Sequence, residues 1–276
     1  MKFDADQQTI IMHMKPSRIL AALRAGRIAT CTKLNLADPR AVEIAALAGF
    51  ESVWLDLEHT ANTPLGIENM VRAAKAYQVD SIVRVTRGSY SDLIHPLEVD
   101  ATGIMVPHVM SLEDARKIVH FTRFHPVGRR PVDGGNADGG FCFINSLDYI
   151  REANDQRCVI VQIEDPEPMD ELDSIAALPG LDVLFFGPTD YSQGIGIPFQ
   201  FDDPRIADAR RRIADAARRH GKFAGTVASP ANLALLYEEG YRFLSMGADV
   251  IGLGNYWRDL GAKFQSFTAT LKPGTP

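Results

Sequence analysis

Short apolar runs rich in β-branched and aromatic residues alternate along the chain with longer segments in which apolar residues recur every three or four positions. The first pattern is typical of buried strands, and the second is typical of amphipathic helices. Helical segments are expected at 16–26, 38–49, 66–78, 111–124 and 203–222. Eight strands are expected, at about residues 28–34, 52–58, 81–86, 103–109, 158–164, 183–187, 223–227 and 242–246.

This alternation predicts the fold class, an α/β protein with a (β/α)8 TIM barrel. Strands that alternate with helices build a parallel sheet from βαβ units, and eight such strands favour closure into a barrel. No repeat beyond this unit and no domain linker is evident, so the expected organisation is a tail at 1–15 and one barrel domain at 16–276. The glycine-rich stretch 125–147 is expected to form one long loop after the fourth strand.

Composition narrows the classes of partner. The net charge of −6 argues against a nucleic-acid surface, which needs clustered Lys and Arg. The cysteines Cys31, Cys142 and Cys158 lack CxxC spacing, so neither a disulfide framework nor a thiolate zinc site is expected. The first residues lack the apolar core of a signal peptide, and no later apolar run approaches the roughly 18 residues of a membrane span. We therefore expect a soluble, cytoplasmic protein without a membrane partner.

Polar residues that end apolar strands are the candidates for chemistry, because barrel active sites lie at the carboxyl ends of the strands. Glu164 and Asp190 end consecutive strands, so their carboxylates can converge on a hard cation such as Mg²⁺, Mn²⁺ or Co²⁺. Taken singly, each could instead cap a helix or pair with an arginine. With no thiolate and one histidine at this rim, a dedicated zinc cage is not expected.

Arg84 lies inside an apolar strand, between Val83 and Val85. An inward-facing guanidinium must be paired, and its fork suits a ketone oxygen or a carboxylate. The alternative is a structural ion pair that faces a helix. His59 ends the run VWLDLEH and could act as a general base, whereas His95, His108 and His125 are expected to be surface or packing residues.

Several motifs together resemble one family. AGFESVWLDLEH, IVRV, MVPHV followed by SLEDARKIV, VIVQIED and LFFGPTDYSQGIG occur in order over roughly residues 16–265, and this series resembles the HpcH/HpaI aldolase family. The resemblance implies a phosphoenolpyruvate/pyruvate-type barrel that joins or separates a 2-oxo acid such as pyruvate and an aldehyde with the help of a divalent metal. It assigns Glu164 and Asp190 to the metal, Arg84 and Gln162 to the 2-oxo acid, and His59 to acid/base catalysis with support from Asp56.

The same resemblance implies a ring-like homo-oligomer, a hexamer or trimer of dimers, with a domain-swapped C-terminal helix within about 248–270. Glu98 stands where the family has the aspartate that supports the histidine, and is expected to take that catalytic role. The turn formed by Gly187, Pro188 and Thr189 is assigned to substrate binding.

Two departures from the family carry their own hypotheses. Lys33 stands where a bulky apolar residue is common, and it could bind an anionic substrate or form a Schiff base. In the loop, Asp133 and Asn136 are expected to help select a hydroxyl-bearing or charged aldehyde, unless the loop is only a connector or a subunit contact. The predicted function is a metal-dependent aldolase; the alternatives are oxaloacetate decarboxylation, which passes through the same enolate, and a non-catalytic metabolite-binding relative.

Overall fold

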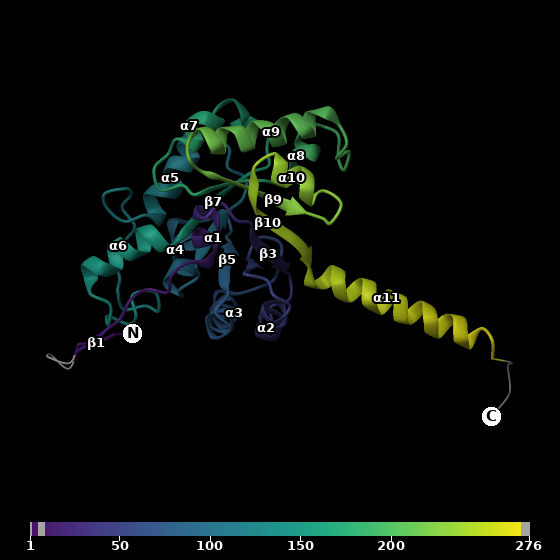
Figure 1. The fold of residues 1–276 in the computed structure, drawn as a ribbon, viewed down its shortest axis with the longest axis horizontal. Helices are drawn as coiled ribbons and strands as arrows, with labels where there is room; N and C mark the ends of the chain where they lie inside the picture. The colour runs from purple at the N-terminus through teal and green to yellow at the C-terminus, as the bar shows by residue number, and fades with distance from the viewer. Residues whose placement is uncertain (1, 5–8, 272–276) are drawn as a thin grey trace.

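All eight predicted strands are present, and they close into a parallel barrel. The computed structural model describes residues 2–4 and 9–271. The strands follow one another around the barrel in chain order, and β9 pairs with β10 while β10 pairs with β3 to close it (Figure 1). Their bounds are β3 (Ala29–Leu34), β4 (Ser52–Asp56), β5 (Asp80–Arg84), β6 (Gly103–Val106), β7 (Cys158–Ile163), β8 (Val183–Phe186), β9 (Phe223–Ala228) and β10 (Tyr241–Ala248).

The strands are apolar on both faces because the barrel wall separates two cores. Inside the barrel, Trp54 packs edge-to-face on Phe185, with ring centroids 5.6 Å apart. Helix α1 (Arg18–Arg24) supplies Ile19 and Leu20 to this inner core and so plugs the amino end of the barrel, confirming the predicted opening helix. Outward residues such as Val53 join the larger core beneath the surrounding helices. Parallel strands buried on both faces are expected to show this continuous apolar pattern.

The predicted helical segments are also present, each with a polar residue that caps its first turn. Asp38, Thr63, Ser111 and Asp203 each accept a backbone N–H from the helix that they precede. The helices around the barrel are α2 (Pro39–Leu47), α3 (Pro64–Ala76), α4 (Tyr90–Glu98), α5 (Leu112–Thr122), α6 (Ser146–Gln156), α7 (Leu172–Ala176), α8 (Pro188–Gly194), α9 (Pro204–Arg219) and α10 (Leu233–Glu238).

The long loop lies at the amino end of the barrel. It connects α5 to α6 over residues 123–145, after a helix that has already carried the chain away from the end of β6. Arg123, at its start, donates to the carbonyl oxygens of Arg157 and Gly180, which lie just before β7 and β8. The Asp138 N–H donates to the carbonyl oxygen of Glu98, in the last turn of α4. The loop therefore faces away from the carboxyl ends of the strands.

Two further elements lie at the chain ends. Within the expected N-terminal tail, β1 (Lys2–Asp4) and β2 (Thr9–Ile11) form an antiparallel pair that the sequence patterns did not predict. Helix α11 (Asp249–Thr268) is the expected C-terminal helix; it projects from the barrel and has no buried residue (Figure 1). No helix in the described part of the chain combines the length and apolar character needed to cross a bilayer.

Candidate active site

A cavity of about 460 Å³ lies at the carboxyl ends of the strands and gathers most of the predicted site residues. Its wall includes Trp54 and Phe185 from the inner core, so the barrel interior forms its floor. Nine of the residues expected at the site line it: Lys33, His59, Arg84, Gln162, Glu164, Gly187, Pro188, Thr189 and Asp190. The parallel strands converge at this end, which is why residues so far apart in sequence meet here.

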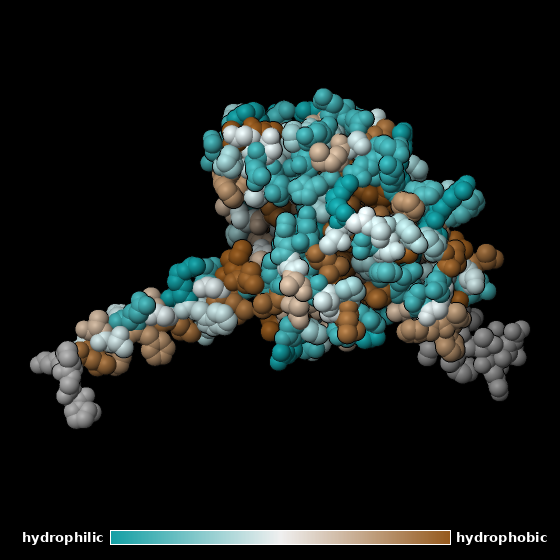
Figure 2. Space-filling view, turned by 180° about the vertical axis from the view of Figure 1, so that it is seen from behind, coloured by the Kyte–Doolittle hydropathy of each residue, from teal (hydrophilic) through white to brown (hydrophobic). Residues whose placement is uncertain are grey.

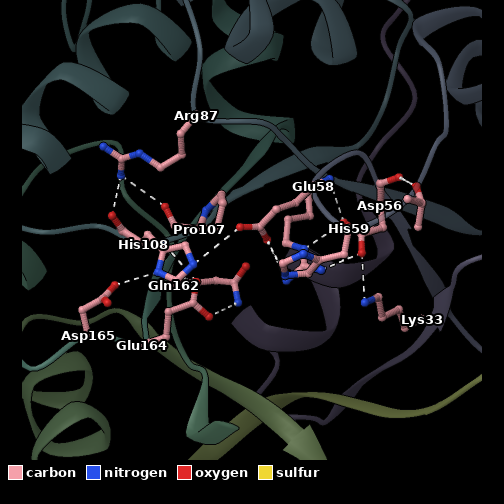
Figure 3. Close-up of polar contacts among 12 residues, drawn as sticks. Lys33, Asp56, Glu58, His59, Arg87, Pro107, His108, Gln162, Glu164 and Asp165 are labelled. Carbon is pink, nitrogen blue, oxygen red and sulfur yellow. Dashed lines mark hydrogen bonds and ion pairs between the residues drawn. The ribbon is translucent and has the colours of Figure 1, made fainter. Parts of the chain in front are cut away.

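Glu164, directly after β7, is a buried carboxylate held by neutral donors. One oxygen accepts the His108 backbone N–H at 2.9 Å, and the other accepts Gln162 Nε2 at 2.8 Å (Figure 3). A Cβ atom at Gly187 would lie 2.4 Å from Glu164 Oε2, so only glycine leaves room for the carboxylate. Burial raises the pKa of Glu164 to about 7, and the Asp190 and Glu58 carboxylates act in the same direction, against the His108 N–H.

The donor set fits a hard divalent cation. Asp190, in the first turn of α8, lines the same cavity as Glu164. Across residues 12–271, no Lys or Arg lies within ion-pair distance of Glu164, whose nearest cationic candidate is the His108 ring at 3.9 Å. Two carboxylates without a counter-ion suit Mg²⁺, Mn²⁺ or Co²⁺. Because the described residues hold no cluster of three or more metal-ligating side chains, water or substrate oxygens would have to supply the other ligands.

Arg84 points into the barrel and is ion-paired there, so it does not form the helix-facing ion pair that the sequence left open as the alternative. Its Nε and Nη2 donate to Asp56 at 2.9 and 2.6 Å, and its Nη1 lies 2.9 Å from Glu58 Oε2. The guanidinium also lies 4.7 Å from the ring centre of Trp54. A guanidinium has five N–H donors, so the two hydrogen bonds to Asp56 leave the Nη1 side, beside Glu58, able to donate to a ligand.

Asp56 is the anchor of this cluster. It accepts Arg84, and its Oδ2 lies 2.9 Å from Lys33 Nζ. Although burial alone raises the pKa of Asp56, the hydrogen bonds and charges of Arg84 and Lys33 lower it to about 2. Lys33 is thus engaged by a carboxylate and lies 5.3 Å from the Trp54 ring centre. This geometry suits a lysine that holds charge at the cavity wall, and it gives no support to the Schiff-base alternative.

His59 lies in the loop after β4 and is more than half exposed at the cavity mouth. Its carboxylate neighbour is Glu58, whose Oε2 is 3.5 Å from His59 Nε2. The expected partner, Glu98, is not there: it lies in the last turn of α4, at the amino end of the barrel, where Arg130 and Asp138 are its charged neighbours. Because α4 spans the height of the barrel between the two positions, Glu98 cannot support His59 within one chain.

The expected role of Asp133 needs the same correction. The loop that contains Asp133 and Asn136 follows α5, not the strand, and therefore lies at the amino end. It is internally organised there: Asp133 accepts the Gly135 N–H, and the buried Arg130 pairs with Asp138 at 2.7 Å. Within one chain, Asp133 cannot contact a substrate in the cavity at the opposite end.

His108 is the residue that the sequence patterns missed. It was expected to be a packing or surface histidine, but it follows β6 and adjoins Glu164. Its backbone is left-handed, with φ of 49°, which is uncommon for a non-glycine residue and occurs often at functional sites. Its Nδ1 lies 2.9 Å from Asp165 Oδ2, and its Nε2 lies 3.6 Å from Glu58 Oε1 (Figure 3). Its position at a strand end was the available signal.

The pKa of His108 depends on the carboxylates that surround it. Burial alone lowers the pKa of His108, but the hydrogen bond that its ring donates to Asp165 and the charges of Glu164, Asp165 and Glu58 raise the pKa overall. Figure 3 shows Glu58 between the two histidines, His108 and His59. A continuous polar network therefore joins the Glu164 side of the cavity to the Arg84 side.

Comparisons with known proteins identify the family of this chain. Residues 33–255 match the family described as HpcH/HpaI aldolase/citrate lyase. The 4-hydroxy-2-oxo-heptane-1,7-dioate aldolase of Shigella sonnei (strain Ss046) is 33% identical over 92% of this chain and 97% of its own length. The hydroxypyruvate/pyruvate aldolase of Pseudomonas aeruginosa is 32% identical over 92% and 95%. The solved HpcH/HpaI aldolase from Desulfitobacterium hafniense DCB-2 superposes with a TM-score of 0.83 at 31% identity, covering 94% of this chain and 99% of that one.

Proposed function

Since the chain belongs to the HpcH/HpaI aldolase/citrate lyase family, we propose that it is a divalent-metal-dependent aldolase that uses a pyruvate-type 2-oxo acid and an aldehyde. The chain is a carbon–carbon lyase of the aldolase type; a decarboxylase or a non-catalytic role is not favoured, because relatives matched over 92% of it are named aldolases. One observation carries the metal-dependent part: Glu164 is a buried carboxylate without a Lys or Arg partner among residues 12–271, in the same cavity as Asp190 and Arg84.

Glu164 and Asp190 are the residues that would hold the cation, Mg²⁺, Mn²⁺ or Co²⁺. When bound, the cation supplies positive charge that stabilises the negative charge developing on the keto oxygen of the 2-oxo acid. The chain fixes the direction of Glu164 in advance, because the Gln162 amide and the His108 N–H each hold one carboxylate oxygen. Such outer contacts orient a ligand before it binds.

Arg84 adds fixed positive charge at the substrate oxygen. Two hydrogen bonds to Asp56 hold one edge of its guanidinium and Glu58 lies 2.9 Å from Nη1, so the remaining N–H groups keep one direction. Preorganised donors aimed at a developing oxyanion are usually the largest single contribution to rate. Arg84 therefore stabilises the enolate form of the 2-oxo acid without reorganising during the reaction.

His59 is the proton carrier, because it lies at the cavity wall and remains open to solvent. It takes a proton from the methyl group of the 2-oxo acid, and the resulting enolate carbon forms a bond to the aldehyde carbon. The carbonyl electron pair moves onto the aldehyde oxygen, which takes up a proton to give a 2-oxo-4-hydroxy acid. In the cleavage direction, His59 takes the proton of the 4-hydroxyl group as the C3–C4 bond breaks.

The test is exchange of the pyruvate methyl protons with deuterium, which reports enolisation without an aldehyde. Wild-type protein is expected to exchange them with Mn²⁺ or Mg²⁺ present, and a chelator is expected to stop the exchange until metal is returned. Arg84→Lys is expected to lower the exchange rate about 100-fold, because an ammonium cannot reproduce the fork. Borohydride added with pyruvate should leave Lys33 unmodified; a stable mass increase there would replace this mechanism with an imine mechanism.

The proposal includes a homo-oligomer in which α11 packs on another copy of the chain. Helix α11 carries apolar side chains that no other part of the described chain buries (Figure 2). Its start contacts β3 and β10, but a long helix with no buried residue is marginal in water, and an apolar surface of this kind marks an interaction site. Exposed Ile44 on α2 lines the same cavity as Leu253 of α11 and extends this surface.

Light scattering tests the assembly. Full-length protein is expected to be a hexamer, as the family resemblance implies, and a chain that ends at residue 248 is expected to lose that state. A wild-type protein that stays monomeric at micromolar concentration would contradict the oligomer while leaving the aldolase proposal untouched.

A further inference from the structure

A second cavity, of about 360 Å³, adjoins the candidate active site outside the ends of β8 and β9. It lies under α10 and the start of α9. The two cavities have four wall residues in common: Pro188, Thr189, Val227 and Ala228. A molecule that reacts beside Asp190 therefore has this second space as its nearest neighbour on the α8 side.

The wall of the second cavity is mainly apolar. Its apolar lining includes Phe186, Phe201, Ile206, Leu235 and Leu236. Its charged side chains are paired or exposed. Arg210 Nη2 donates to Glu239 at 2.8 Å, Asn232 Oδ1 accepts the Ser229 N–H at 2.7 Å, and Asp202 is exposed. The one cationic side chain of the wall thus already has a carboxylate partner, so the cavity suits an uncharged group better than an anion.

The outer edge of this cavity is fixed in place by an aromatic turn. Phe199 is left-handed, with φ of 61°, and its N–H donates to Ser192 Oγ at 3.1 Å. Ser192 in turn donates to the carbonyl oxygen of Thr189, which belongs to the common wall. The Phe199 and Phe201 rings meet edge-to-face, 6.3 Å apart, and both remain exposed. The chain thus holds an exposed aromatic edge in a defined relation to the active site.

We propose that this second cavity receives the tail of the aldehyde acceptor, and that the acceptor is an uncharged aliphatic or aromatic aldehyde. The inference rests on the proposed aldolase function and names its substrate class. The volume is about twice that of an apolar cavity that holds benzene, so it accommodates a tail of roughly six carbons. With the long loop at the opposite end of the barrel, the apolar wall replaces Asp133 and Asn136 as the feature that selects the aldehyde.

A larger apolar cavity, of about 620 Å³, lies on the other side of the site, between α2 and the start of α11. It shares only Gly247 and Ala248 with the active-site cavity. Its wall includes Leu253 of α11, the helix that we propose to meet a second copy of the chain. The smaller cavity is therefore the better continuation of the active site, and the larger one provides a matched control.

The experiment compares kcat/KM for a series of aldehydes from propanal to octanal, with pyruvate as partner and glycolaldehyde as a short polar reference. For the wild type, kcat/KM is expected to rise roughly fourfold per methylene up to about six carbons and then level off. Leu235→Ala should lower kcat/KM for hexanal about tenfold and leave glycolaldehyde unchanged. Ser229→Trp, which fills the cavity, should exclude hexanal and also leave glycolaldehyde unchanged.

Leu36→Ala is the matched control, because Leu36 lines the larger cavity and is 40% exposed, against 45% for Leu235. In this variant, kcat/KM is expected to depend on aldehyde length as it does in the wild type. A flat series in the wild type, or a loss of hexanal preference in Leu36→Ala but not in Leu235→Ala, overturns the proposal. Pyruvate deuterium exchange is followed in every variant: its presence with a flat series rejects only the tail cavity, whereas its absence in the wild type rejects the aldolase proposal itself.

Discussion

The two ends of the barrel both bury charged side chains, but they compensate the charge differently. At the amino end, Arg130 and Asp138 are almost inaccessible and pair with each other at 2.7 Å, and Tyr149 adds a hydrogen bond to the same carboxylate. Asp80 likewise accepts the Ser17 hydroxyl and the Ile19 N–H. Arg130 and Lys15 supply a cationic partner to Asp138 and Asp80, the second at 3.4 Å.

At the carboxyl end, Glu164 is just as buried, but only neutral donors and the His108 ring are near it. An uncompensated buried carboxylate is costly, and a protein retains one when a ligand completes it. The difference teaches that buried charge by itself does not mark a functional site. What marks it is a buried charge whose counter-ion is absent from the described chain.

Neutralising Glu164 is the most direct test of this difference between the two ends of the barrel. Glu164→Gln is expected to lower pyruvate deuterium exchange by about 1,000-fold or more, because the site loses one of two metal carboxylates. The thermal midpoint should not fall, since the change also removes repulsion with Asp190 and Glu58. NMR measures the deuterium exchange rate, and calorimetry measures the thermal midpoint. Wild-type exchange after chelation and metal return would remove Glu164 from the metal site.

Removing a buried carboxylate at the amino end should lower the unfolding free energy and leave the rate of pyruvate deuterium exchange unchanged. Asp138→Ala removes the acceptor of both Arg130 and Tyr149 and leaves the buried guanidinium without its carboxylate, so it is expected to cost about 3–5 kcal/mol of unfolding free energy. Exchange per folded molecule should stay near wild type. Urea unfolding measures the loss, and the double variant Arg130→Met with Asp138→Leu should recover much of it. A stable Asp138→Ala protein with slow exchange would place this pair in the site.

The pH dependence of stability should have opposite signs at the two ends. The Asp56 carboxyl has a pKa of about 2 against an ordinary 3.8, so its ionised form stabilises the fold above pH 3.8 and that stability is lost as pH falls toward 2. Burial raises the pKa of Asp138 above its ordinary 3.8, although Arg130 and Tyr149 oppose the shift, so this contribution to stability is complete below pH 3.8 and is lost as pH rises through the raised pKa.

Urea titrations between pH 2 and 6 test this difference. The unfolding free energy of the wild type minus that of Asp56→Asn should shrink on acidification, whereas the same difference for Asp138→Asn should grow. Parallel changes in both variants would show that the two carboxylates are not held differently.

Much of the fold and of the candidate site could be predicted from local sequence. Strands such as β7 are mainly apolar on both faces, and β7 is followed directly by Glu164 and Asp165, so both the strand and the acidic residues at its end are recognisable. Arg84 stood out for the complementary reason, as a charge inside an apolar run. These signals depend on neighbours in sequence, which the chain carries directly.

The predictions that the single-chain structure corrects are those that depended on which end of the barrel a residue reaches. Asp133 and Glu98 were assigned to the site by composition and by family position, although each follows most of a helix that leads away from it. Counting one helix after each strand would have placed both at the amino end. The prediction for His108 was wrong for a different reason. Its place at the site depends on a left-handed backbone and on contact with Glu164, which follows another strand, and neither is visible from a single histidine in the sequence.

The smallest predicted effects compare two lysines that each contact a buried aspartate. Lys33 lies 2.9 Å from Asp56 at the site, and Lys15 lies 3.4 Å from Asp80 at the amino end. Both aspartates keep other partners, so Lys33→Met and Lys15→Met should each change the unfolding free energy by no more than about 1 kcal/mol. Only Lys33 lines the cavity, so only Lys33→Met should raise KM for the 2-oxo acid, by about tenfold, because it removes a positive charge near an anionic substrate. Steady-state kinetics measure the change in KM, and urea unfolding measures the change in unfolding free energy. If Lys33→Met alters stability and leaves KM unchanged, Lys33 is a structural partner of Asp56 in the way that Lys15 is of Asp80, and it leaves the substrate-binding set.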